Sequence, residues 1–266
     1  MREGIGIFDS GLGGLTVMRK IRQKCPSESI IYYGDTARVP YGGKSPETIL
    51  RYTIEGAIFL MEQKIKALVI ACNTAASYSM ERLKNIFPLP IIDVIGPGAE
   101  AATRATSNGR IAILGTKATI ASGAYQREIA RRRDNTYVLP LACPLFVPLV
   151  EESFLDHPAT NLIVQEYLKP VKAAGVDTLL LGCTHYPVLF PLIQKELGPS
   201  VQIVDSATTS AEELASLLDQ SPEALSPPSC RFFVSDDPEK FKLLGPAFLG
   251  APIEACEQVR HELQAV

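Results

Sequence analysis

Two apolar segments of this chain end in the same way, and together they constrain its fold more than any other feature. Residues 67–71 form an apolar run that stops at Cys72-Asn73-Thr74, and residues 178–182 form another that stops at Cys183-Thr184-His185. Short apolar runs that lead into a helical pattern are typical of buried strands in parallel sheets. We therefore expect each cysteine at the point where a strand passes into a helix.

Strand-like and helix-like segments alternate along most of the chain, which predicts parallel sheets covered by helices on both faces. Ser45-Pro46 has the pattern of a helix start, and the Gly96-Pro97-Gly98 segment is expected to close a strand. Residues 221–229 are expected as a linker and residues 253–259 as a last strand or extended tail. The main strands are predicted at residues 5–8, 30–33, 67–71, 91–95, 110–114, 137–141, 178–182, 201–204 and 231–234.

The second half of the chain repeats the layout of the first. Leu114 follows Phe8 by 106 residues, and Cys183 follows Cys72 by 111 residues, so two landmarks recur at similar spacing. This indicates an internal duplication. We predict two similar parallel-sheet α/β domains related by pseudo-two-fold symmetry, with the active site in the cleft between them. The first domain would comprise residues 1–96 plus 207–266, and the second residues 97–206.

Composition excludes several classes of function. A net charge of -3 over 266 residues gives no basic footprint for nucleic acid or an anionic membrane. The longest apolar runs are far shorter than the ~20 residues that span a bilayer. Arg2 and Glu3 lead directly into an expected first strand rather than a signal peptide, so we expect a cytoplasmic protein.

The six cysteines have no C-x-x-C pair and no zinc-finger spacing, so neither a metal site nor a disulfide framework is expected. Four of them have no chemistry-bearing neighbours and are interpreted as structural: Cys25, Cys143, Cys230 and Cys256. Cys72 and Cys183 differ because each is expected at a helix N-terminus. Free backbone N–H groups there attract anions and favour a thiolate near neutral pH.

Two thiols on opposite sides of a cleft suit the inversion of a carbon that carries an acidic hydrogen. One thiolate removes the proton from one face, and the other thiol delivers a proton to the opposite face. No lysine lies in the strand-end motifs, the nearest being Lys44 and Lys117, so a lysine-bound pyridoxal phosphate is not expected. We predict a cofactor-free mechanism in a largely dry cleft.

The chain closely resembles the glutamate racemases, within the cofactor-independent aspartate/glutamate racemase superfamily. The Cys-Thr-His form and Pro40-Tyr41-Gly42 are more similar to glutamate than to aspartate racemases. The matching motifs span nearly the whole chain in the family's order: residues 6–14, 33–35, 40–42, 71–75, 144–152, Leu181-Gly-Cys-Thr-His-Tyr-Pro187 and residues 204–206.

The resemblance implies that Cys72 and Cys183 are the two acid/base thiols. Asp9 and His185 would assist them, together with a glutamate from the Glu151-Glu152 pair, of which we favour Glu151. It also implies a homodimer, and a role in supplying D-glutamate for peptidoglycan and the cell wall. The implied substrate contacts are Asp9, Ser10, Tyr41, Gly42, Asn73, Thr74, Thr184 and His185.

Less specific interpretations stay open for most of these residues. Asp9 could only cap a helix, His185 could be a loop histidine, Tyr41-Gly42 a turn, and the glutamate pair surface acids. Asp35 is expected to order its loop, and Asp205-Ser206 to cap a helix. Racemisation of aspartate or another acidic amino acid is the nearest alternative. A dinucleotide-binding oxidoreductase is disfavoured because Thr16 replaces the third glycine of the fingerprint. A redox or interaction protein that uses its thiols is the third alternative.

Overall fold

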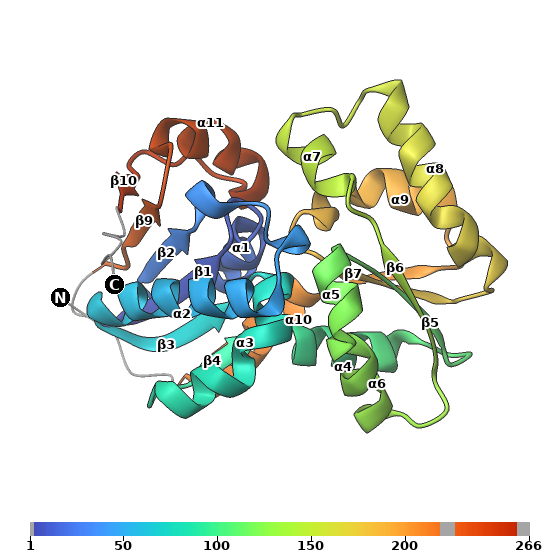
Figure 1. The fold of residues 1–266 in the computed structure, drawn as a ribbon, viewed down its shortest axis with the longest axis horizontal. Helices are drawn as coiled ribbons and strands as arrows, with labels where there is room; N and C mark the ends of the chain where they lie inside the picture. The colour runs from blue at the N-terminus through green and yellow to red at the C-terminus, as the bar shows by residue number, and fades with distance from the viewer. Residues whose placement is uncertain (1–2, 219–226, 260–266) are drawn as a thin grey trace.

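Two parallel β-sheets, one in each of two lobes, form the frame of the protein, which a computed structural model describes over residues 3–218 and 227–259 (Figure 1). The first lobe contains β1 (Gly4–Asp9), β2 (Ile30–Gly34), β3 (Ile65–Ile70), β4 (Ile91–Asp93), β9 (Cys230–Val234) and β10 (Glu257–Gln258). The second contains β5 (Arg110–Gly115), β6 (Tyr137–Ala142), β7 (Thr178–Gly182) and β8 (Gln202–Asp205).

The two sheets share one strand order. The first sheet runs β10-β9-β2-β1-β3-β4 and the second β6-β5-β7-β8, so β2-β1-β3-β4 corresponds strand for strand to the whole second sheet. β3, which leads to Cys72, therefore corresponds to β7, which leads to Cys183. The predicted fold class of two similar parallel-sheet α/β domains is confirmed. The domain boundaries themselves stay predictions.

Helices connect the strands within each lobe. The first lobe holds α1 (Leu15–Lys24), α2 (Pro46–Glu62), α3 (Asn73–Ile86), α10 (Ser206–Leu217) and α11 (Pro238–Leu249). α4 (Ile95–Ala105) packs against β7, β8 and α6, whereas α10 packs against α1 and α4. The second lobe also holds α5 (Lys117–Ser122), α6 (Ala124–Arg132), α7 (Phe146–Glu151), α8 (Pro158–Ala173) and α9 (Phe190–Leu197). Three 3₁₀ turns complete the fold: η1 (Thr36–Arg38), η2 (Tyr41–Gly43) and η3 (Tyr186–Leu189).

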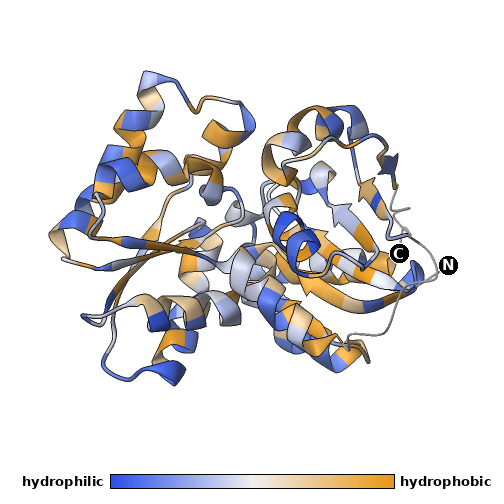
Figure 2. Ribbon diagram, turned by 180° about the vertical axis from the view of Figure 1, so that it is seen from behind, coloured by the Kyte–Doolittle hydropathy of each residue, from blue (hydrophilic) through white to orange (hydrophobic). Residues whose placement is uncertain are grey.

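The core lies along the central strands. β1, β2 and β7 are buried along their whole length, because parallel strands have helices on both faces. Figure 2 shows hydrophobic residues along the strands of both lobes. The Ser45 side chain accepts a hydrogen bond from the Thr48 N–H at the start of α2, with Pro46 in the first turn, as the sequence pattern predicts.

One sequence-based expectation is wrong. The Gly96-Pro97-Gly98 segment does not close a strand; it lies in the first turns of α4, where the Asp93 carboxylate accepts hydrogen bonds from the N–H groups of Ile95 and Gly96. Proline is tolerated there because its missing N–H would have no partner within the helix. Of residues 253–259, only Glu257–Gln258 pair as a strand. Most of the expected linker at residues 221–229 lies outside the described residues.

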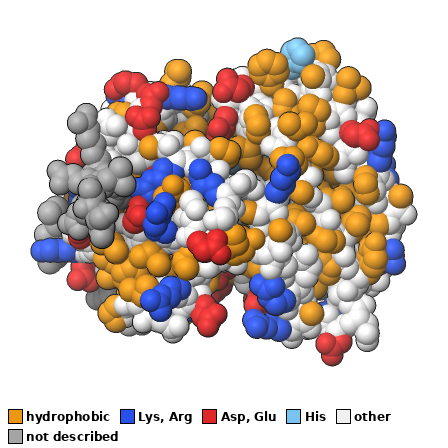
Figure 3. Space-filling model, in the orientation of Figure 1, with side chains coloured by type: hydrophobic (Ala, Val, Ile, Leu, Met, Phe, Trp, Pro, Cys, Tyr) orange, Lys and Arg blue, Asp and Glu red, His pale blue; other side chains and the backbone are white. Residues whose placement is uncertain are grey.

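The surface offers no single dominant charge on the face shown in Figure 3, where basic and acidic side chains are interspersed over both lobes. Across residues 3–218 and 227–259, we find no helix with the length and apolar character needed to cross a membrane. The same ranges contain no cluster of three or more histidine, cysteine, aspartate or glutamate side chains that could hold a metal ion.

Candidate active site

A cavity of about 370 Å³ lies between the two lobes, at the ends of their central strands. Both cysteines singled out by the sequence, Cys72 and Cys183, line it. They come from opposite lobes, because each follows the corresponding strand of its own sheet. The other predicted residues on its wall are Ser10, Tyr41, Gly42, Asn73, Thr74, Glu151, Glu152, Thr184 and His185.

Cys72 stands at the N-cap of α3 and is 5% exposed. Its thiol donates a hydrogen bond to the Ser10 hydroxyl, with 3.5 Å between Sγ and Oγ. Burial, reinforced by the nearby Asp9 carboxylate, raises the pKa of Cys72 to about 12, although Ser10 and the Ala75 N–H act in the opposite direction. This raised pKa contradicts the expectation that the helix N-terminus makes the Cys72 thiolate accessible near neutral pH. Cys72 is a thiol at neutral pH.

Asp9 ends β1 directly behind the cavity wall and is completely buried. One carboxylate oxygen, Oδ2, accepts a hydrogen bond of 2.8 Å from the Gly11 N–H. The other, Oδ1, has no hydrogen-bond partner among the described residues. Burial raises the pKa of Asp9, against the opposing effect of His185. Asp9 is not among the lining residues, so its predicted contact with substrate stays a prediction.

Cys183 begins a chain of polar contacts within the second lobe. Its sulfur lies 4.0 Å from Nδ1 of His185, whose Nε2 lies 2.8 Å from Oε1 of Glu151. Burial alone would lower the pKa of His185, but the hydrogen bonds to Cys183 and Glu151 outweigh it and raise the pKa to about 10. His185 is therefore an imidazolium at neutral pH.

Of the two adjacent acids, Glu151 is the one that contacts His185. Burial raises the pKa of Glu151, but the hydrogen bond from His185 and its charge more than offset this, so the net shift is downward. Glu152 also lines the cavity. The geometry supports the earlier preference for Glu151 as the assisting acid.

The Gly11-Leu12-Gly13-Gly14 turn is shaped by close packing. A Cβ added to Gly13 would lie 2.2 Å from Thr184 Oγ1 and 2.5 Å from His185 Nδ1. A Cβ added to Gly14 would lie 2.5 Å from Cβ of Asp9. The glycines thus allow the start of α1 to reach the opposite lobe and the buried carboxylate, which explains them without a bound phosphate.

Hydroxyl and amide groups from both lobes meet at one end of the cavity. The hydroxyls of Thr74, Thr116 and Thr119 contact one another, with Oγ1–Oγ1 distances of 2.9, 3.0 and 3.2 Å. The Asn73 amide donates a hydrogen bond of 2.7 Å to the Tyr125 hydroxyl. These groups can hydrogen-bond a carboxylate without a basic side chain. Thr116, which lines the cavity, is in contact with Thr74 across the two lobes.

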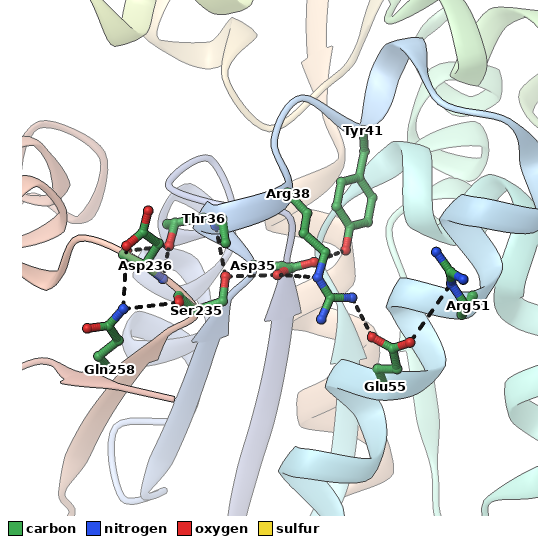
Figure 4. A network of polar contacts seen from close by, with 10 residues as sticks. Asp35, Thr36, Arg38, Tyr41, Arg51, Glu55, Ser235, Asp236 and Gln258 are labelled. Atoms are coloured by element: carbon green, nitrogen blue, oxygen red, sulfur yellow. Dashed lines mark hydrogen bonds and ion pairs between the residues drawn. The ribbon is translucent and has the colours of Figure 1, made fainter. Parts of the chain in front are cut away.

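Tyr41 is held by a network of polar side chains behind the wall (Figure 4). Its hydroxyl donates a hydrogen bond of 2.5 Å to Asp35, whose other oxygen accepts one of 2.8 Å from Ser235 on the segment after β9. Arg38 lies between Asp35 and Glu55, forming ion pairs with both. Because the Tyr41 hydroxyl is hydrogen-bonded to Asp35, Tyr41 contributes its ring to the cavity wall, and the adjacent Gly42 also lines it. Asp35 thus orders its loop, as predicted.

This network gives a stability prediction. Replacing Asp35 by alanine leaves the buried Tyr41 hydroxyl without its acceptor, so we expect the free energy of unfolding to fall by roughly 1–3 kcal/mol. Urea unfolding measures it. Asp134→Ala, at an exposed position in the second lobe, is the matched control and should change stability by less than about 0.5 kcal/mol. Equal stability of the two variants would contradict the assigned role of Asp35.

Sequence reasoning missed part of the cavity wall. Lys117 lies on it, although the motif analysis placed it only near a strand end. The rest of the wall is formed by apolar residues and a glycine, namely Val39, Pro40 and Gly43 from the first lobe and Pro144, Val147 and Pro148 from the second. By contrast, Asp205 serves as the predicted cap, accepting hydrogen bonds from the Ala207 and Thr208 N–H groups of α10.

Two α/β lobes with one strand order, each contributing a cysteine to the wall of one cavity, form a site that can supply two acid/base groups, and comparisons with known proteins place the chain in a racemase family. The chain matches the Asp/Glu/Hydantoin racemase family over residues 5–214, and it belongs to that family. Among curated relatives, the glutamate racemase of Syntrophus aciditrophicus is 47% identical, with 96% of each chain covered, and that of Geobacter metallireducens is 46% identical, with 98% of each covered.

Solved structures point the same way. Glutamate racemase isoform RacE1 from Bacillus anthracis superposes with a TM-score of 0.93 at 38% identity, covering 97% of both chains. Glutamate racemase from Francisella tularensis, determined in complex with D-glutamate, superposes with a TM-score of 0.91 at 37% identity, again covering 97% of both chains.

Proposed function

We propose that this protein is an enzyme that interconverts L-glutamate and D-glutamate. The single observation that carries the proposal is the pair of cysteines at corresponding strand ends of two duplicated lobes, both on the wall of one cavity. The similarity to glutamate racemases over nearly the whole chain supports glutamate as the substrate.

The proposed reaction uses the two thiols in turn. The thiolate of one cysteine takes the Cα proton, so a C–H bond breaks and an S–H bond forms. The thiol of the other cysteine gives its proton to the opposite face, so an S–H bond breaks and a new C–H bond forms. The electron pair stays on Cα and its carboxylate between these steps. Each enantiomer thus has its own base, and no other reactant is consumed.

Cys72 and Cys183 have different polar neighbours, and this affects which proton transfers each can perform. Cys183 lies beside the His185 ring, which Glu151 holds, and serves as the first base, while the raised pKa of Cys72 keeps the proton on that thiol. In this protonation state the enzyme can remove the Cα proton of one enantiomer. For the other, Cys72 must lose its proton, and the buried Asp9 beside it has a raised pKa that makes it a suitable acceptor.

Substrate binding would rely on neutral donors. We propose that the glutamate carboxylates are held by backbone N–H groups at the starts of helices and by the side chains of Ser10, Asn73, Thr74 and Thr184. Gly42 and the ring of Tyr41 would close the wall around the substrate. Lys117 is the one lysine on the described wall and adds a positive charge at the edge of the cavity.

The proposal is tested by optical rotation. Purified protein without added cofactor should bring separate solutions of L- and D-glutamate to zero rotation, with no pyridoxal absorbance in its spectrum. Aspartate at the same concentration should keep its rotation. Loss of rotation with aspartate but not glutamate would reassign the substrate, and activity that requires added pyridoxal phosphate would overturn the two-thiol mechanism.

We further propose that the enzyme acts in the cytoplasm as a homodimer and supplies D-glutamate for peptidoglycan synthesis. The support is the resemblance to the glutamate racemases rather than any single contact. Size-exclusion chromatography with light scattering tests the dimer, and a monomer at assay concentration would contradict it.

A further inference from the structure

A phenylalanine of the first lobe lies against the histidine that serves Cys183 in the second lobe. The rings of Phe248, on α11, and His185 meet edge to face, with centroids 5.5 Å apart and planes at 82°. Both side chains are buried, with exposures of 3% and 5%. Phe248 is not among the residues that line the cavity, so it reaches the chemistry only through His185.

The remaining sides of the His185 ring are also occupied. Glu151 lies at Nε2 and Cys183 at Nδ1, both from the second lobe. Gly13 of the first lobe packs so closely that an added Cβ would lie 2.7 Å from Cε1. The first lobe therefore contributes two packing contacts, Gly13 and Phe248, which hold an imidazole whose hydrogen-bond partners Cys183 and Glu151 belong to the other lobe.

We propose that Phe248 is a positioning residue for the half of the reaction that Cys183 performs. The aromatic ring fixes the tilt of the imidazole and keeps water from the His185–Glu151 pair. This inference rests on the proposed racemase function. It gives α11 a role in the reaction, although the sequence of this region carried no chemical signal.

Replacing Phe248 by leucine leaves a gap beside the imidazole. His185 can then tilt away from Cys183, and water can reach the ion pair. The proton transfers at Cys183 become slower, while those at Cys72, in the other lobe, keep their surroundings. We expect kcat/KM to fall roughly tenfold. The fall must be equal in both directions, because the two enantiomers have equal free energies.

A deuterium label at Cα of the substrate distinguishes the proton transfers at Cys183 from those at Cys72. In the direction in which Cys183 removes the deuteron, a slower Cys183 step becomes more rate-limiting, so the primary isotope effect on kcat/KM rises. In the reverse direction Cys183 only donates a solvent proton, so the isotope effect falls. A general loss of folded protein changes neither isotope effect, because each is a ratio measured on the same active molecules.

The experiment measures kcat/KM for Cα-protiated and Cα-deuterated L- and D-glutamate with the wild type, Phe248→Leu and Phe241→Leu. Phe241 is the matched control: it lies on the same helix, is 1% exposed, and packs against Tyr32 and Phe232 rather than His185. We expect opposite changes in the two isotope effects for Phe248→Leu and none for Phe241→Leu. Phe248→Met carries the same test if the leucine variant is not recovered folded.

Isotope effects for the Phe248 variants that match the wild type, or that change equally in both directions, would overturn the positioning role. The same opposite changes in Phe241→Leu would also overturn it, because they would arise from α11 in general. A wild-type protein that does not racemise glutamate would instead overturn the proposed function itself. The failure of one proposal is thus distinguishable from the failure of the other.

Discussion

Cys72→Ala and Cys183→Ala are each expected to lower kcat/KM for racemisation of glutamate by about 10³-fold or more, in both directions. Each cycle needs one thiolate and one thiol, so loss of either sulfur removes an essential proton transfer, and such transfers contribute about 10²–10⁴-fold each. A coupled assay for L-glutamate formed from D-glutamate, and the reverse assay, measure the loss.

The two variants should also differ from each other. Each retains the base for one enantiomer, so each should still exchange the Cα hydrogen of that enantiomer with D2O, and the preferred enantiomer should be opposite in the two variants. Cys143→Ala is the control, because Cys143 is a completely buried thiol of the second lobe outside the cavity wall. Racemisation that survives in either Cys72→Ala or Cys183→Ala would refute the two-thiol mechanism.

Gly13→Ala is expected to lower kcat/KM by about 10²-fold, the size of effect that a displacement of about 1 Å at a catalytic group produces. The added methyl would lie 2.2 Å from Thr184 Oγ1 and 2.5 Å from His185 Nδ1, far inside van der Waals contact. Relief requires either the imidazole to leave Cys183 or the two lobes to move apart. Steady-state kinetics measure the loss.

Gly96→Ala is the matched control for this substitution. A Cβ at Gly96 has its nearest contacts at 3.7 and 3.9 Å, and the residue lies in helix α4, where alanine is favoured over glycine. We expect its activity to match the wild type. Full activity of Gly13→Ala would show that the cleft tolerates displacement of His185, and would weaken the assigned geometry on the Cys183 side.

The fold was largely predictable because strand and helix periods are local signals. The apolar runs before Cys72 and Cys183 marked corresponding strands of two sheets, and the recurrence of this pattern predicted two similar domains, which the shared strand order confirms. The error at Gly96-Pro97-Gly98 has a physical reason. Glycine and proline suggest a turn, but in the first turn of a helix neither breaks a hydrogen bond, and the Asp93 side chain caps the start of α4.

The candidate site was predictable where one residue carries the chemistry and not where several residues share it. Cys183 and His185 are only two positions apart in sequence, so their pairing could be anticipated. The contact between His185 and Phe248 joins residues 63 positions apart in two lobes, and no sequence pattern indicates it. The wall residues Lys117 and Thr116 were likewise fixed only by how the lobes face each other.

The protonation state of Cys72 could not be predicted from the sequence either. Its place at the start of α3 predicts a stabilised thiolate, because the helix N-terminus favours negative charge. Burial and the Asp9 carboxylate have the larger effect, and the pKa rises to about 12 instead. The helix N-terminus can be predicted from the sequence. The carboxylate belongs to a strand about 60 residues earlier, and its distance from Cys72 cannot be predicted from the sequence.

The most direct test of two thiols acting on opposite faces is the origin of the hydrogen at Cα. The wild-type protein is incubated in D2O with L-glutamate and, separately, with D-glutamate, and both enantiomers are isolated at low conversion and examined by mass spectrometry. The proposed mechanism predicts one deuterium at Cα of the product and protium in the recovered substrate, in both directions. Product that keeps the original protium would mean that one base returns the same hydrogen to the opposite face, and would contradict the mechanism.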